Sequence, residues 1–103
     1  MDIIFGRENA ESLRQTHTVL DLETIHQDGV TLEVFCLISA DKLKLDELPQ
    51  LEENIKLHNE FLQGYNNGHH EYCNQAVAHL RGKFGGELDT FYDEILKRIN
   101  SNT

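Results

Sequence analysis

The hydrophobic positions in the last third of the chain recur with the period of an α-helix. The apolar residues there are spaced at i, i+3, i+4, i+7, i+8 and i+11: Leu88, Phe91, Tyr92, Ile95, Leu96 and Ile99. This spacing places all six in one stripe on one face of a helix. The sequence therefore predicts a C-terminal helix whose apolar face must be covered by another part of the protein.

A second helix is predicted over residues 47–65. Asp46 is expected to cap it, and Pro49 falls in its first turn, where the missing backbone N–H is harmless. Its apolar residues form one stripe at spacings of three to four together with a second stripe on a neighbouring face: Leu48, Leu51, Ile55, Leu62 and Tyr65, then Leu57 and Phe61. Two stripes indicate contact with two neighbours.

A third helix is predicted over residues 69–81, after the helix-stopping sequence Asn66-Asn67-Gly68. It presents a further set of apolar side chains: Tyr72, Cys73, Ala76, Val77 and Leu80. The glycine-containing segment 82–86 then separates this helix from the C-terminal one. This half of the chain, residues 46–100, is expected to contain three helices.

The N-terminal half has a β-type pattern. Residues 16–38 are β-branched and alternating on either side of His26-Gln27-Asp28-Gly29, which predicts a hairpin. In its first strand, Leu20 and Leu22 share a face with Thr18 and Thr24, and Asp21 and Glu23 point away. In its second strand, five alternate apolar residues share a face: Val30, Leu32, Val34, Cys36 and Ile38. Residues 2–5 predict a short strand, and residues 8–15 predict a short helix.

Together these elements predict an α+β fold in a single domain of 103 residues. A small antiparallel sheet, made of the N-terminal strand and the hairpin within residues 1–38, is expected to pack against the helical half. A two-stranded hairpin is marginally stable in water, so the helices are its expected cover. At 39% hydrophobic residues the core is thin, which favours self-association.

Charge excludes several classes of partner. The chain carries 18 acidic and 9 basic residues, a formal net charge of −9, so its field repels phosphate backbones and anionic lipid surfaces. Nucleic acid and membranes are therefore not expected partners. The N-terminus lacks a basic segment followed by a long apolar one, and Cys36 and Cys73 are the two cysteines. A cytoplasmic protein with reduced thiols is predicted.

Histidine and cysteine side chains are the candidates for chemistry. The densest group of metal-ligand types consists of four residues, to which His58 on the preceding helix could add a ligand: His69, His70, Glu71 and Cys73. His69 and Cys73 lie four residues apart, a spacing that suits two ligands of a tetrahedral zinc site. A structural zinc site normally has a second pair of ligands, and the sequence has no such pair. The simpler interpretation is therefore that His69 and His70 are exposed and that Cys73 is a core residue. No metal and no cofactor are predicted.

Carboxylates and glycines single out no catalytic site. Glu52 and Glu53 adjoin one another on a helix, while Glu87 and Asp89 start another, where the helix dipole and capping account for them. The segment 82–86 follows a helix rather than a strand and lacks the Lys-Ser/Thr pair of a phosphate-binding loop. It is interpreted as a connector, and an enzymatic activity is not the favoured prediction.

The favoured function is a non-enzymatic protein–protein interaction or accessory module that self-associates, with a dimer as the favoured assembly. Its expected contact surfaces are the aromatic-bearing helices and the edge of the hairpin. Aromatic residues are enriched in interface cores, and the helical half has more of them than one thin sheet face can cover. The interface candidates are Leu57, Phe61, Tyr65, Tyr72, Phe84 and Phe91. The alternative is a small-ligand or metal-binding protein, which could be an enzyme, with a pocket that includes His58, His69, Tyr72 and Cys73.

Overall fold

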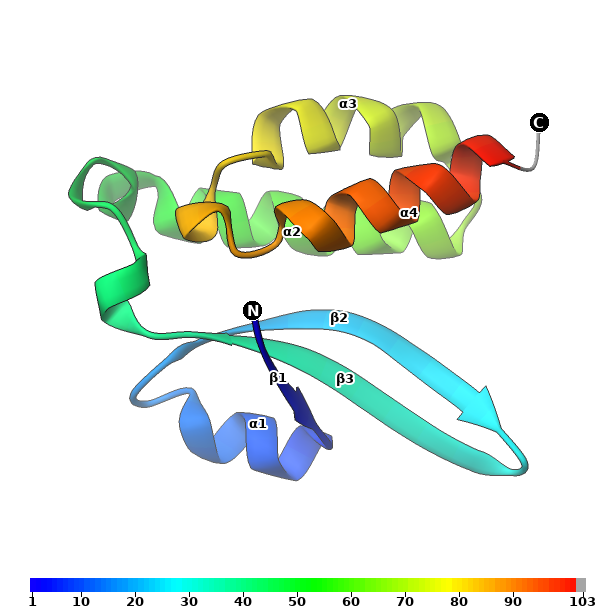
Figure 1. The fold of residues 1–103 in the computed structure, drawn as a ribbon, viewed down its shortest axis with the longest axis horizontal. Helices are drawn as coiled ribbons and strands as arrows, with labels where there is room; N and C mark the ends of the chain where they lie inside the picture. The colour runs from blue at the N-terminus through cyan, green and yellow to red at the C-terminus, as the bar shows by residue number, and fades with distance from the viewer. Residues whose placement is uncertain (102–103) are drawn as a thin grey trace. The chain divides into compact units, whose positions relative to one another are not determined.

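The computed structural model describes residues 1–101 and has an α+β fold (Figure 1). The strands and α-helices are β1 (Asp2–Phe5), α1 (Arg7–Leu13), β2 (Thr18–Gln27), β3 (Val30–Ile38), α2 (Leu51–Asn66), α3 (His70–Leu80) and α4 (Asp89–Ser101). The chain divides into two compact units, a sheet unit from Met1 to Leu43 and a helical unit from Lys44 onward. The predicted strand, short helix, hairpin and three C-terminal helices are all present.

The sheet unit is built on three antiparallel strands in the order β1-β3-β2. The central strand is β3, and its Phe35 lies opposite Ile4 of β1 and Asp21 of β2. A two-residue turn at Asp28 and Gly29 joins β2 to β3, and both residues have positive φ, 51° and 78°. Asp-Gly is a favoured pair for this turn because both residues tolerate the left-handed conformation. The predicted hairpin is confirmed.

A β-bulge changes the predicted face of the distal part of β2. Leu20 lies opposite Cys36, but the register shifts between Asp21 and Glu23, so Thr24 lies opposite Glu33 and Ile25 opposite Leu32. Residues directly opposite one another in a sheet share a face. Thr24 therefore lies on the face opposite Leu20, and its predicted place beside Leu20 was wrong. The extra residue of the bulge reverses the alternation and brings Ile25 onto the apolar face of β3.

Helix α1 covers the face of the sheet that carries Val19 and Phe35, which is opposite to the face of Leu20. Ala10 of α1, Val19 of β2 and Phe35 of β3 are buried against one another, with partly buried apolar residues around them: Ile4, Leu13 and Leu37. The guanidinium of Arg7 lies 5.2 Å from the centroid of the Phe35 ring. This small core needs residues from one helix and all three strands.

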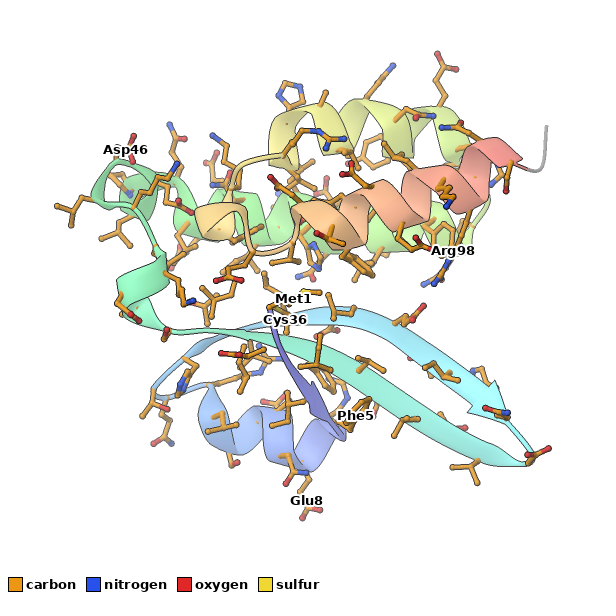
Figure 2. All side chains as sticks on the ribbon, viewed as in Figure 1. Met1, Phe5, Glu8, Cys36, Asp46 and Arg98 are labelled. Atoms are coloured by element: carbon orange, nitrogen blue, oxygen red, sulfur yellow. The ribbon has the colours of Figure 1, made fainter. Side chains whose placement is uncertain are left out.

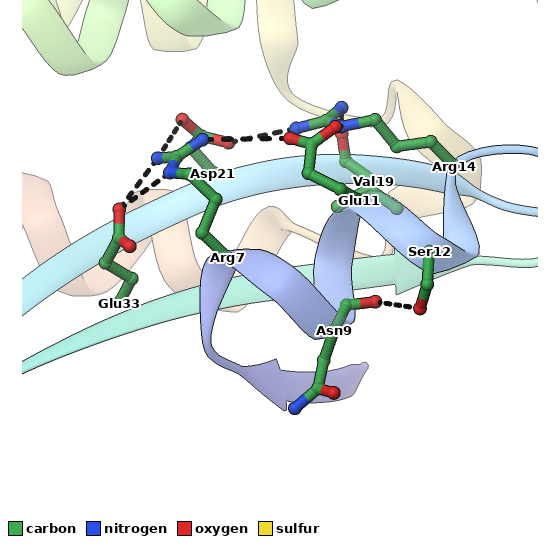
Figure 3. Close-up of polar contacts among 8 residues, drawn as sticks. All are labelled: Arg7, Asn9, Glu11, Ser12, Arg14, Val19, Asp21 and Glu33. Atoms are coloured by element: carbon green, nitrogen blue, oxygen red, sulfur yellow. Dashed lines mark hydrogen bonds and ion pairs between the residues drawn. The ribbon is translucent and has the colours of Figure 1, made fainter.

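Ion pairs surround that core at the surface (Figure 3). The Arg7 Nη2 atom lies 2.8 Å from Oε2 of Glu33 and 3.9 Å from Oδ2 of Asp21, and Arg14 Nη2 lies 3.7 Å from Oδ1 of Asp21. The hydrogen bond and charge of Glu33 raise the pKa of the Arg7 guanidinium above its ordinary value. The two arginines thus neutralise carboxylates on both strands of the hairpin.

The helical unit begins with a 3₁₀ helix, Leu45–Gln50, which leads into α2 at Leu51. The prediction of one α-helix over residues 47–65 with Asp46 as its cap was therefore wrong at its start. Pro49 lies within the 3₁₀ helix, which begins after Lys44, where the carboxylate of Glu47 accepts a hydrogen bond from the Lys44 N–H. Asp46 is exposed, and its neighbour Glu47 is buried instead.

Helices α2 and α3 contact one another, and α3 also contacts α4. The predicted stripe of the C-terminal helix is confirmed: Leu88, Tyr92, Ile95 and Ile99 are buried. Phe91 and Leu96, at the flanks of the stripe, are partly buried. The 3.6-residue period thus correctly predicted the face that α4 buries.

Candidate interaction surfaces

Aromatic rings of the helical unit gather around His58 of α2. Its ring centroid lies 6.2 Å from that of Phe84, 6.4 Å from those of Phe61 and Phe91, and 5.8 Å from that of Tyr92. Phe61 and Tyr92 meet edge to face at 5.4 Å, a favourable arrangement of ring quadrupoles. This cluster joins α2, α4 and the loop before α4.

His58 itself is completely buried and belongs to this packing. Its Nδ1 atom and the hydroxyl of Tyr92 share a hydrogen bond of 2.8 Å. A buried imidazole needs polar partners, because an unsatisfied ring nitrogen in an apolar site costs free energy. Among the predicted ligand candidates, His58 therefore takes a position in the core.

Three of the six predicted interface residues lie in the same cluster: Phe61, Phe84 and Phe91. Phe61 and Phe84 have no exposed surface. The other four are partly buried: Leu57, Tyr65, Tyr72 and Phe91. Only these four keep side-chain surface that a partner could contact, so the aromatic surplus of the sequence is mostly used inside the helical unit.

Tyr72 illustrates how α3 packs on α2. Its hydroxyl donates to Oε2 of Glu60 at 3.1 Å, and its ring covers Gly64, where an added Cβ would lie 3.0 Å from Cδ2 of the ring. Burial, followed by the hydrogen bond to Glu60, raises the pKa of Tyr72 above its ordinary value of 10.0. The glycine permits this close approach of the two helices, because any side chain would push the ring away.

The other predicted ligands are separated by burial. His69 and His70 are exposed at the start of α3, whereas Cys73 is completely buried and its thiol points to the carbonyl oxygen of Phe61 at 3.7 Å. Burial raises the pKa of the Cys73 thiol, which disfavours the thiolate needed by a nucleophile or a metal ligand. Within residues 1–101, no group of three or more His, Cys, Asp or Glu side chains is placed to hold a metal ion.

Glu47 makes polar contacts that sequence reasoning missed. Its Oε1 accepts a hydrogen bond from the backbone N–H of Phe84 at 2.7 Å. Its Oε2 accepts hydrogen bonds from the backbone N–H groups of Gly85 and Lys44, each at 3.3 Å. It is 7% exposed. The carboxylate thus ties the 3₁₀ helix before α2 to the loop before α4.

The loop itself is shaped to present these donors. Phe84, Gly85 and Gly86 have φ values of 55°, 66° and 75°, so successive N–H groups turn toward one side. Such backbone concavities bind anions, and here the anion is the chain's own carboxylate. Segment 82–86 is therefore a connector, as predicted, and the carboxylate of Glu47 stabilises its conformation. Next to it, Asp89 accepts a hydrogen bond from Gly82 N at 2.8 Å.

Exposed apolar side chains concentrate in the sheet unit. Five of them are more than a third exposed in the strands: Ile3 at 41%, Phe5 at 50%, Ile25 at 38%, Val30 at 63% and Leu32 at 37%. In the helical unit, Leu45 at 85% and Leu48 at 45% are the corresponding residues. The sequence interpretation named the hairpin edge as a contact surface beside the aromatic-bearing helices, but all six of its candidate residues lie in the helical half.

Comparisons with known proteins find no match. No family model, no curated protein and no solved structure is similar to this chain. In the described part, residues 1–101, no helix combines the length and apolar character that crossing a membrane requires. The candidate surfaces therefore rest on the geometry above.

Proposed function

We propose that this chain is a non-enzymatic accessory module that acts through protein–protein contact and that associates with itself, the dimer being the smallest assembly. The observation that supports it most directly is the set of exposed apolar residues in the strands of the sheet unit. The strand register places these five large apolar side chains on one face of the sheet, and exposed apolar patches mark interaction sites.

The distribution of buried polar groups is consistent with this proposal. Within residues 1–101, the buried carboxylate and the buried imidazole, Glu47 and His58, make hydrogen bonds to other parts of the helical unit. Cys73 is held in a form unsuited to nucleophilic attack. Side chains in these positions stabilise a fold and leave little that could act on a substrate.

The test is the solution mass of the purified protein, measured by light scattering over a hundredfold range of concentration. The expected result is a rise from the monomer mass of 11.9 kDa toward twice that value as concentration increases. Bound metal is counted on the same samples. A mass of one chain at every concentration would contradict self-association, and zinc at one ion per chain would instead favour the metal-binding alternative.

A further inference from the structure

The hairpin projects beyond the rest of the sheet unit (Figure 1). Pairing between β1 and β3 ends at Phe5 opposite Val34, followed by one hydrogen bond from Gly6 N to the Glu33 oxygen. From there to the turn, β2 and β3 pair only with each other. Residues 24–32, which we call the hairpin arm, are all exposed. A two-stranded ribbon is marginally stable by itself, so this arm gains most from a partner.

The arm has one apolar face and one polar face. Because of the bulge, Ile25 of β2 lies opposite Leu32 of β3 and shares its face. Val30 lies two residues before Leu32 on β3, so its side chain is on the same face. Phe5 continues this face at the base of the arm, since it lies opposite Val34 (Figure 2). On the other face, His26 and Thr31 share a hydrogen bond of 3.2 Å.

We propose that the apolar face of the hairpin arm binds the same face of a second copy of this chain, so that two arms pack face to face. This inference rests on the proposed function and names its contact surface. Strands packed face to face bury the side chains of both inner faces between them. The contact would consist of Ile25, Val30, Leu32 and Phe5 from each copy.

The charge distribution favours a second copy over a charged partner. A twofold contact places the same surface on both sides, so a patch rich in carboxylates would repel itself, as much of this chain with net charge −9 would. The arm carries one acidic residue, Asp28 at its tip, and no lysine or arginine. At its base, Glu23 lies on the apolar face opposite Val34, whereas Glu33 lies on the other face and is paired with Arg7. Apart from the turn, each arm therefore brings a single carboxylate to the contact face, and a basic partner finds little to attract it.

The substitutions Val30→Thr and Leu32→Thr, combined in one variant, test this contact. Both residues lie on the central strand, so the free outer edge of β2 is unchanged, and threonine is a β-branched residue that suits a strand. The matched control is Leu45→Thr combined with Leu48→Thr, which removes two exposed leucines of the helical unit. Circular dichroism confirms that each variant is folded, and sedimentation equilibrium gives its dimer dissociation constant.

The expected result is a dissociation constant about tenfold or more above that of the wild type for the arm variant, and an unchanged constant for the control. A folded arm variant that dimerises like the wild type would overturn the arm contact while leaving self-association standing. A wild type that stays monomeric would overturn both proposals. The two failures are therefore distinguishable.

Cross-linking provides a second readout that does not depend on weakening the fold. Leu32 lies in the middle of the proposed contact, between Val30 and the Phe5–Val34 pair, and we place the twofold axis there. With Leu32→Cys, the new thiols of the two arms then meet at this axis, and mild oxidation is expected to yield a covalent dimer. Thr31→Cys is the matched control, since residue 31 lies on the opposite face of the same strand. Equal cross-linking of both variants, or none with Leu32→Cys at a concentration where the protein is dimeric, would contradict the proposed geometry.

Discussion

The two units of this protein differ in how completely they bury their apolar side chains. In the helical unit, aromatic rings from α2, α4 and the preceding loop surround His58, and a buried carboxylate holds the loop. In the sheet unit, one helix covers one face of the strands, and the hairpin arm has exposed residues on both faces. A region whose apolar side chains are already packed exposes little apolar surface that a partner could cover. The arm still exposes apolar surface, so burying it against a partner is favourable.

Truncating matched phenylalanines in the two units is the strongest way to break this comparison. Phe61→Ala removes a completely buried ring from the helical unit, and we expect a loss of about 3–5 kcal/mol in the free energy of unfolding. Phe5→Ala removes a half-exposed ring from the edge of the sheet and is expected to cost far less. Urea denaturation followed by circular dichroism measures both, and similar losses would show that the two units do not differ in this way.

The buried carboxylate of the helical unit gives the next largest effect. Glu47→Ala leaves the N–H groups of Phe84 and Gly85 without their acceptor, and we expect a loss of about 1–3 kcal/mol in unfolding free energy. Glu47→Gln keeps one acceptor oxygen and is expected to lose less. The control is Asp46→Ala, which removes the exposed neighbouring carboxylate. If Asp46→Ala were the more destabilising change in thermal denaturation, Asp46 rather than Glu47 would be the structural residue at this helix start.

Substitutions in the arm are expected to have the smallest effect on the stability of the single chain. Val30→Thr replaces a side chain that is 63% exposed, and we expect a change within about 0.5 kcal/mol when the protein is dilute. Val19→Thr makes the same replacement in the core beneath α1, where burying the hydroxyl is expected to cost about 1–3 kcal/mol. Unfolding curves at low protein concentration separate the two. A large loss for Val30→Thr would mean that the arm is packed within its own chain.

The element types were predictable because each depends on a period that neighbouring residues carry. The alternation along 30–38 and the 3.6-residue repeat from Leu88 to Ile99 specify a strand and a helix whatever surrounds them. The Asp28-Gly29 turn is likewise a local property, since both residues tolerate positive φ. The local pattern failed at the start of α2, because Asp46 lies inside a 3₁₀ helix and does not cap the α-helix that begins at Leu51.

The candidate site was less predictable, because it depends on residues far apart in the chain. Nothing around residue 47 shows that its carboxylate reaches the N–H groups of residues 84 and 85, and nothing around Phe61 shows that Tyr92 covers it. The sequence predicts an excess of aromatic residues in the helical half, but it does not show that Phe61 and Phe84 are completely buried. Whether an aromatic side chain is buried or offered to a partner is decided by which other elements meet it.

By itself, the amino-acid sequence determined the α+β class, the hairpin, the three C-terminal helices and the strongly acidic character. Only the tertiary structure decided the strand order, the bulge that carries Ile25 onto the apolar face of β3, and the internal use of Glu47 and His58. The physical reason is the range of the interactions. Backbone periodicity and turn conformation act over a few residues, whereas burial and hydrogen-bond pairing depend on contacts between segments that only the folded chain brings together.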